Sequence, residues 1–260
     1  MKKKKGTSKT MKKVMPDGGF RTEAEKESGA RLCKAFEESV DPLEARLDNF
    51  PKYARRQRLT RFLSLYEIFK KALPIKGSVV ECGVYRGFGL MSWANFSAIL
   101  EPTNLTRRIY GFDSFGGFPG VSEKDSNPLL DTARGQLNSD SYDEMLKLVE
   151  IFDSNRFLGH INKVGLIKGD ACKTIPEFVS KNRHLVVSLL FLDMDLYEPT
   201  KIAIENFLPR MPKGAVIAFD ELDNPMWPGE TTALLETIGI KNLKIQRLEF
   251  DPYIGFAEIE

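Results

Sequence analysis

The chain has 260 residues, of which 38 are basic and 36 acidic, and its formal net charge is +2. Seven lysines lie within the first 13 residues, which contain no acid, so the rest of the chain has 31 basic and 36 acidic residues. A mildly acidic body excludes a typical nucleic-acid-binding surface, and no apolar run is long enough for a membrane span. The three cysteines form no CxxC pair, which excludes a zinc site of that kind and favours a reduced, cytoplasmic setting.

The first part of the chain is predicted to be a tail followed by helices. Residues 1–20 are polar and aperiodic, which predicts a disordered basic tail. Thr22 and Glu25 have capping-box spacing, and Pro74 must end a later helix. The helical extension over residues 21–74 is expected to contain a helix over 22–40, a short irregular or helical stretch over 42–51, and a helix over 55–73.

From residue 75 onward, short apolar runs alternate with helical patterns. Strands are expected at 78–82, 108–112, 164–167, 185–192, 215–219, 243–250 and 253–259, and helices at 89–100, 141–152, 174–182, 199–208 and 228–238. This alternation predicts one α/β domain over residues 75–260, with a doubly wound, Rossmann-like, mostly parallel sheet. The last two strands, around an Asp-Pro turn, predict an antiparallel edge. Residues 113–140 form a long loop of the kind that often acts as a lid.

A glycine-rich turn follows the first expected strand. Its spacing, Glu81-x-Gly83-x-x-x-Gly87-x-Gly89, matches neither the dinucleotide fingerprint nor a P-loop. Ligands bind near the first βα turn of doubly wound sheets, and an acid at the strand end suits the ammonium group of adenosylmethionine. We therefore expect Glu81, Gly83, Tyr85 and Gly87 to bind that cofactor, the competing interpretation being an ordinary tight turn.

Two further acids follow strands of the same sheet. Asp113, followed by Ser114, ends the second strand, where a carboxylate can accept both ribose hydroxyls. Asp170, followed by Ala171, comes just after the third strand and could bind the adenine amine. The alternatives are an Asx turn at Asp113 and a helix N-cap at Asp170.

Acids also cluster after the next two strands. Asp193 and Asp195 follow the expected strand at 185–192, which is almost wholly apolar, and Asp220 and Glu221 follow the next strand, at 215–219. If the chain stays extended, Asp193 and Asp195 point the same way, and adjacent parallel strands lie about 4.8 Å apart. Crowded carboxylates favour a hard cation such as Mg²⁺, so we predict a metal site, against the alternative of solvated loop acids. The two histidines, at positions 160 and 184, lack ligand spacing.

In order and spacing, the segments around these sites resemble the macrocin O-methyltransferase (TylF-like) family. The segments are ECGVYRGFG, FDSFGGFP, GDA, FLDMDLYEPT, GAVIAFDE and WPGETTALLE. Members are class I adenosylmethionine-dependent enzymes that methylate sugar hydroxyls, and characterised ones tend to be oligomeric. The resemblance covers roughly residues 55–260.

The resemblance implies a role for each acid. Glu81 and Gly83 would line the methionine end of the cofactor, with Asp113 at the ribose and Asp170 by the adenine. The other roles implied are Mg²⁺ binding by Asp193, Asp220 and Glu221, and proton abstraction by Asp195. The family usually has Asp-Asp where this chain has Asp220-Glu221, which puts Glu221 in doubt as a ligand.

The expected reaction is in-line transfer of the sulfonium methyl group to a sugar hydroxyl. Trp227 is expected to be either a platform on which the sugar stacks or simply a packed residue of its loop. The expected partners are therefore a sugar or glycoside acceptor and further copies of the chain, without nucleic acid. Two alternatives stay open. A catechol-type metal-dependent O-methyltransferase would share the sheet and the metal site, and a non-catalytic cofactor-binding protein would share the fold.

Overall fold

The computed structural model describes residues 22–128 and 130–260, so the predicted basic tail over residues 1–20 lies outside the described residues. The chain divides into two compact units, with the boundary after Arg55. The first unit contains α1 (Glu23–Glu37), α2 (Leu43–Asp48) and the short 3-10 helix η1 (Phe50–Lys52). α3 (Arg56–Ala72) belongs to the second unit. The boundaries after residues 20 and 74 stay predictions.

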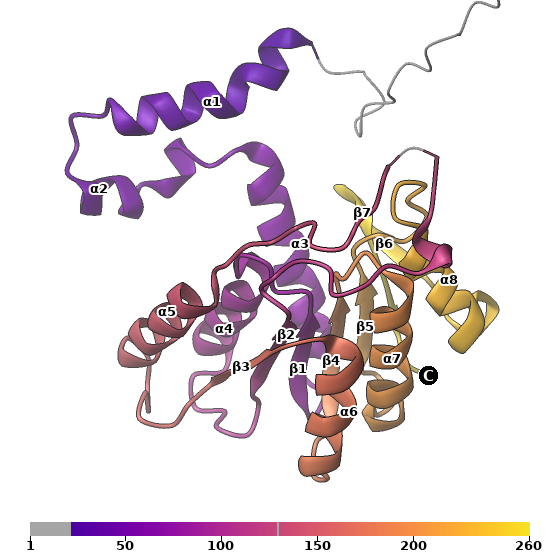
Figure 1. Cartoon of the computed structure of the whole chain (residues 1–260). Helices are drawn as coiled ribbons and strands as arrows, with labels where there is room; N and C mark the ends of the chain where they lie inside the picture. The colour runs from indigo at the N-terminus through magenta and orange to yellow at the C-terminus, as the bar shows by residue number, and fades with distance from the viewer. Residues whose placement is uncertain (1–21, 129) are drawn as a thin grey trace, which may run out of the picture. The chain divides into compact units, whose positions relative to one another are not determined.

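The second unit is built on a sheet whose strand order is β3-β2-β1-β4-β5-β7-β6 (Figure 1). The strands are β1 (Ser78–Cys82), β2 (Ile109–Asp113), β3 (Val164–Lys168), β4 (Val187–Leu192), β5 (Val216–Phe219), β6 (Gln246–Leu248) and β7 (Asp251–Glu258). The first five are parallel, whereas β7 pairs antiparallel with both β5 and β6. The predicted α/β sheet, mostly parallel with an antiparallel C-terminal strand, is confirmed.

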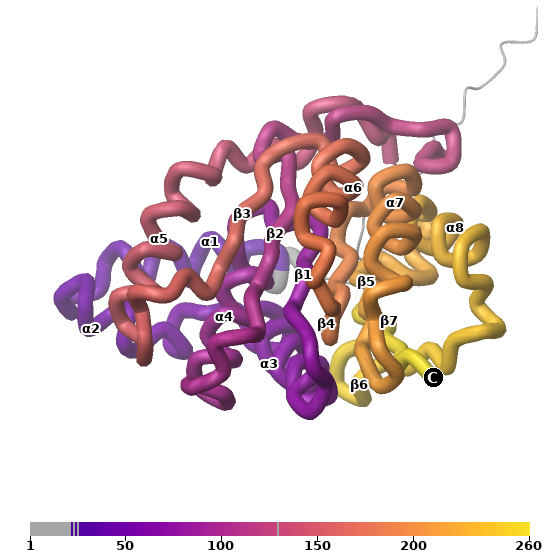
Figure 2. Tube along the Cα trace, turned by 90° about the horizontal axis from the view of Figure 1, so that it is seen from below, coloured from indigo at the N-terminus to yellow at the C-terminus, as the bar shows by residue number. Residues whose placement is uncertain are grey.

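Helices cover both faces of this sheet because its strands are apolar on both sides. Along β4, Leu189 and Phe191 belong to one core, and Leu190 and Leu192 to the other. The first core also takes residues of α3, α4 (Phe88–Leu100) and α5 (Tyr142–Ser154), and the second takes residues of α6 (Ala171–Lys181), α7 (Tyr197–Phe207) and α8 (Pro228–Thr237). Figure 2 shows α3 and α4 on one side of the sheet and α6 and α7 on the other.

Two local expectations were wrong. α6 begins at Ala171 rather than at residue 174, because the Asp170 side chain accepts a hydrogen bond from the Cys172 N–H at 3.0 Å and so caps the helix. The last two strands turn at residues 249–250, and the Asp-Pro pair lies within β7. Asp251 pairs with Leu248 across this two-residue turn.

The strand order reverses between β1 and β4, since the chain passes from β1 outward to β3 and returns to the other side of β1. The carboxyl ends of β1, β2, β4 and β5 therefore meet at one edge of the sheet, where doubly wound folds bind ligands. No helix among the described residues is long and apolar enough to cross a membrane.

Candidate active site

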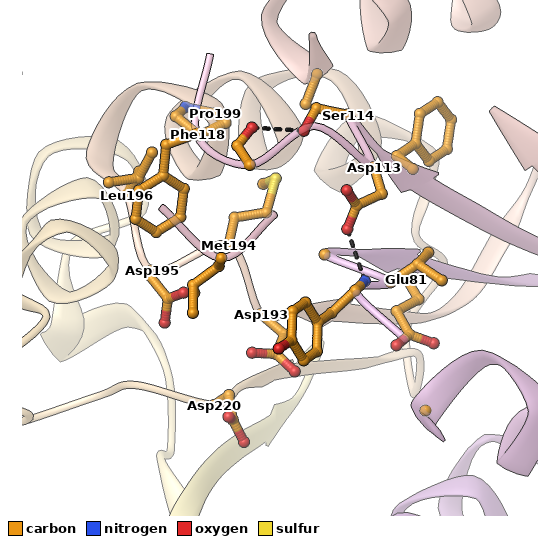
Figure 3. A pocket seen from close by; sticks show the side chains of 18 of the residues that line it. Glu81, Asp113, Ser114, Phe118, Asp193, Met194, Asp195, Leu196, Pro199 and Asp220 are labelled. Carbon is orange, nitrogen blue, oxygen red and sulfur yellow. Dashed lines mark hydrogen bonds between the residues drawn. The ribbon is translucent and has the colours of Figure 1, made fainter. Parts of the chain in front are cut away.

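A cavity of about 980 Å³ opens at this edge of the sheet. It is lined by all the residues predicted to bind the cofactor or the metal: Glu81, Gly83, Tyr85, Gly87, Asp113, Ser114, Asp170, Ala171, Asp193, Asp195, Asp220 and Glu221. In Figure 3, Asp193, Asp195 and Asp220 are grouped at the β4 and β5 ends, and Asp113 lies apart from them at the β2 end. One cavity thus connects the predicted cofactor residues with the acid cluster.

The turn after β1 depends on glycines for two separate reasons. Gly83 has a φ of +98°, and a Cβ there would overlap the carbonyl oxygen of Asp193. This glycine therefore lets the turn pack directly against the chain leaving β4. Gly89, in the first turn of α4, leaves the space that the Glu81 carboxylate occupies.

Glu81 carries a buried carboxylate with an unsatisfied oxygen. Its side chain is 1% exposed, and its Oε2 has no hydrogen-bond partner. Burial raises the pKa of Glu81, while the positive charge of Arg61 opposes that shift. A buried acceptor without a partner is costly unless a ligand supplies one, and the ammonium group of adenosylmethionine fits this requirement.

Asp113 organises the loop that follows β2. Its Oδ2 accepts a hydrogen bond from the Tyr85 N–H at 2.7 Å, which ties the β1 turn to the β2 end (Figure 3), and its Oδ1 accepts one from the Phe115 N–H at 2.6 Å. The second bond is the Asx turn considered from the sequence. Ser114 supports the same loop by donating to the Gly117 carbonyl oxygen at 2.6 Å. Each carboxylate oxygen can still accept a further hydrogen bond.

Asp170 is a helix cap that also lines the cavity. Its carboxylate caps α6, as described above, and it also lines the cavity together with Ala171, the first residue of that helix. The capping interpretation is therefore correct, and an interaction with the adenine stays a prediction.

Two acids of the cluster share an arginine that sequence reasoning missed. Arg61 on α3 donates to Asp193 Oδ2 at 2.7 Å and also to Asp220 Oδ1. The pKa of Asp193 is raised by burial and by the charge of Asp220, and Arg61 partly offsets this. The guanidinium thus occupies the position between the two aspartates that were predicted to hold Mg²⁺.

Asp195 does not continue the direction of β4, so the expected extended geometry was wrong. The strand ends at Leu192, and Asp195 adopts a left-handed conformation with φ +62°. Its side chain is 8% exposed. Burial, followed by the charges of Glu221 and Asp220, raises the pKa of Asp195 to about 8, which is a suitable range for a general base.

Glu221 is held by a local contact. The Asn224 side-chain amide donates to its carboxylate, and burial together with the charge of Asp220 raises its pKa to about 7. As the side chains stand, no three His, Cys, Asp or Glu residues within the described ranges are arranged to hold a metal ion.

Comparison with known proteins identifies the family. A profile of the macrocin O-methyltransferase (TylF) family matches residues 48–245. The chain belongs to this family. Among solved structures, the calicheamicin methyltransferase CalS11 is 35% identical, with a TM-score of 0.87 over 92% of this chain and 93% of that one. No curated protein matches the chain.

Two further structures extend the comparison. Apo CalS11, described as a TDP-rhamnose 3'-O-methyltransferase of calicheamicin biosynthesis, is 31% identical with a TM-score of 0.79, over 92% of this chain and 95% of that one. The O-methyltransferase NovP is 19% identical with a TM-score of 0.53, over 77% of this chain and 79% of that one, and shares the fold. The chain is thus an adenosylmethionine-dependent O-methyltransferase.

Two aromatic side chains form part of the wall of the methyltransferase cavity. Trp227 and Phe118 line it, and their rings pack edge to face at 5.8 Å. Trp227 is therefore both a packed loop residue and a wall of the cavity. His160 and His184 are exposed and lie outside the cavity lining.

Sequence reasoning missed two residues that contact the acid cluster or its loops, Arg61 and Glu230. Arg61 lies among the apolar residues that predicted α3, and no signal indicated which polar residue of that helix faces the acids. Glu230 is part of the segment WPGETTALLE, which helped to identify the family but gave no role for its glutamate. A fully buried glutamate in the first turn of α8 is visible only in the fold.

Proposed function

We propose that this methyltransferase transfers the methyl group of adenosylmethionine to a hydroxyl of a nucleotide-linked sugar, and that Asp195 removes the proton of that hydroxyl. The observation that carries the proposal is the single cavity. It joins Glu81 and Asp113, the residues predicted to bind the cofactor, with the aspartates after β4 and β5. Donor and acceptor bound there would meet in the space between the two groups.

Each residue then has a defined task. Glu81 would accept hydrogen bonds from the cofactor ammonium, Asp113 from the ribose hydroxyls, and Asp170 from the adenine amine. When bound, adenosylmethionine supplies the methyl group. The main contribution of the protein would be to hold the acceptor oxygen in line with it, while the Asp195 carboxylate takes the hydroxyl proton.

A nucleotide-linked acceptor is supported by two arginines. Arg58 and Arg86 line the cavity and are exposed, and neither forms an ion pair with a described residue. Unpaired guanidinium groups bind phosphate oxygens well. CalS11, the similar enzyme, acts on TDP-rhamnose according to its description, and a diphosphate is the charged part of such a substrate.

We further propose that Mg²⁺ binds to Asp193, Asp220 and Glu221 in exchange for Arg61. The donor type fits, because carboxylate oxygens are ligands that Mg²⁺ prefers, and a divalent charge would relieve the repulsion that raises the pKa of Asp193. Arg61 now occupies one oxygen of each aspartate, so its guanidinium must leave first. Bound Mg²⁺ would favour the ionised form of the acceptor hydroxyl.

The acceptor is tested with a panel of a TDP-deoxysugar, a neutral rhamnoside and a catechol, each assayed for methyl transfer from adenosylmethionine. We expect the TDP-deoxysugar to have the highest kcat/KM. Arg58→Met should raise KM for this acceptor about tenfold and leave KM for the rhamnoside unchanged. Preferential methylation of the catechol would support the catechol-type alternative, and cofactor binding without any transfer would support the non-catalytic one.

The acids are tested by titrating Mg²⁺ into Asp193→Asn, Asp220→Asn and Asp195→Asn after EDTA treatment. Excess Mg²⁺ should partly restore the methyl-transfer rate of Asp193→Asn and Asp220→Asn, since each variant loses one charged metal ligand. Asp195→Asn should lose about 10²–10⁴-fold in kcat without rescue. The exposed Glu205→Gln serves as a control. Full wild-type activity after EDTA would remove the metal from the mechanism, and rescue of Asp195→Asn by Mg²⁺ would make Asp195 a ligand.

A further inference from the structure

Glu230 is a fully buried acid that contributes no surface to the cavity. It lies in the first turn of α8, its side chain is 0% exposed, and it is absent from the cavity lining. A carboxylate buried to this degree needs several hydrogen bonds. The partners of Glu230 come from the two loops that carry the acid cluster.

Within the described residues, the hydrogen bonds that its carboxylate accepts come from backbone N–H groups. Oε1 accepts from the N–H of Met194 at 3.1 Å and from that of Asp195 at 3.3 Å. Oε2 accepts from the N–H of Glu221 at 3.0 Å. One side chain therefore joins the loop after β4 to the loop after β5.

These contacts lie where the backbone most needs support. Asp195 has a φ of +62°, a left-handed conformation that is uncommon for any residue other than glycine, although aspartate and asparagine tolerate it better than most. It persists only where surrounding contacts determine it. The bonds from Met194 and Asp195 to one oxygen act on both peptides that lead into this conformation. The neighbouring Gly229 allows the approach, because a Cβ there would overlap the backbone of Leu196 and Tyr197.

We propose that Glu230 is a positioning residue that sets the orientation of the Asp195 carboxylate and ties it to the loop of Glu221. This proposal rests on the proposed function of Asp195 as the base. A carboxylate is required because only it offers two acceptor oxygens. A glutamine has one acceptor oxygen, and its NH₂ group would face a backbone N–H. An aspartate is one methylene shorter and cannot span both loops.

The first test measures the loops themselves by hydrogen exchange with mass spectrometry on the full-length protein. Glu230→Gln should increase exchange at least about tenfold in peptides covering residues 193–198 and 220–224. The control Glu205→Gln, an exposed glutamate on α7, should leave both peptides unchanged. Unchanged exchange in Glu230→Gln would overturn the proposal, whether or not an acceptor is known. Increased exchange throughout the chain would overturn it as well, since it would indicate general destabilisation.

The second test is a double-mutant cycle with Asp195→Asn. Glu230→Gln alone should lower kcat about 10–100-fold with KM and cofactor affinity within about twofold of the wild type. In the Asp195→Asn background, Glu230→Gln should cost no more than about twofold, because both changes disable the same group. An equal factor in both backgrounds would overturn the positioning role, since it would place Glu230 outside the action of Asp195. Full activity of Asp195→Asn would instead refute the assignment of the base, and the exchange result would still stand for the loops.

Discussion

Replacing Arg61 with methionine removes the cation between Asp193 and Asp220 and keeps a side chain of similar length. In the structure the guanidinium donates to both carboxylates. The side chains of the three residues are 21%, 25% and 13% exposed, respectively. The substitution would therefore leave two largely buried, neighbouring carboxylates without their counter-ion.

The cost follows from this degree of burial. Removing one partner of a fully buried ion pair costs about 3–5 kcal/mol, whereas an exposed pair is worth at most about 1 kcal/mol. For this partly exposed triad we expect a loss of about 2–3 kcal/mol in the free energy of unfolding without metal. In a domain of this size, about 2–4 °C of Tm corresponds to each kcal/mol, so Tm should fall by about 4–12 °C.

Mg²⁺ should recover most of this loss in the Arg61→Met variant. A ligand at 100 times its Kd stabilises the folded state by about 2.7 kcal/mol, which is similar to the expected loss. In the wild type, Mg²⁺ must first displace the guanidinium, so the same concentration should raise Tm less. If Mg²⁺ and Arg61 exchange at this site, Mg²⁺ should therefore raise the Tm of Arg61→Met more than that of the wild type.

The assay is thermal unfolding in EDTA and in increasing Mg²⁺, followed by circular dichroism. The control is Arg56→Met, an exposed arginine at the start of α3 that does not line the cavity. It should match the wild type at every concentration. The reasoning is refuted if Arg61→Met is as stable as the wild type in EDTA, or if Mg²⁺ raises its Tm no more than that of the wild type.

Three other predictions follow from the site and the tail. Gly83→Ala should weaken adenosylmethionine binding at least about tenfold in calorimetry, because Gly83 has a positive φ and a Cβ there would overlap a carbonyl oxygen of the β4 loop. The control Gly116→Ala should bind adenosylmethionine like the wild type, because the nearest neighbour of its Cβ would be 3.9 Å away. The pKa of Asp195 is raised to about 8 in the folded state, so the folded protein binds this proton more tightly than the unfolded chain. The free energy of unfolding should therefore decrease as pH rises from about 4 to 8, and Asp195→Asn should make this decrease smaller. Urea unfolding at a series of pH values measures it, and the same pH dependence in the variant and the wild type would contradict the assignment. Deleting residues 1–15 should leave Tm and kcat nearly unchanged, and a loss of activity or assembly would reveal a function of the tail.

The sequence alone predicted the elements and their type well, because local patterns determine them. β1 was predicted at its observed bounds, Ser78–Cys82, since a short apolar run before a glycine-rich turn admits few other structures. The sequence also predicted correctly that the acids lie near one another. Parallel strands end at one edge of their sheet, so residues that follow adjacent strands lie close together. The acids that line the cavity could therefore be predicted without coordinates.

Tertiary structure alone decided how these acids are oriented and what neutralises them. The left-handed Asp195 donates a backbone hydrogen bond to Glu230, 35 positions away in sequence, and Asp193 and Asp220 both accept from Arg61, 132 positions from Asp193. No local pattern encodes such partners. Helical periodicity indicates which face of α3 or α8 is apolar, but which polar group meets a carboxylate depends on the packing of both elements in three dimensions. A pair of acids looks the same in sequence whether its counter-ion is a metal or an arginine, and here the folded chain places the guanidinium of Arg61 between them.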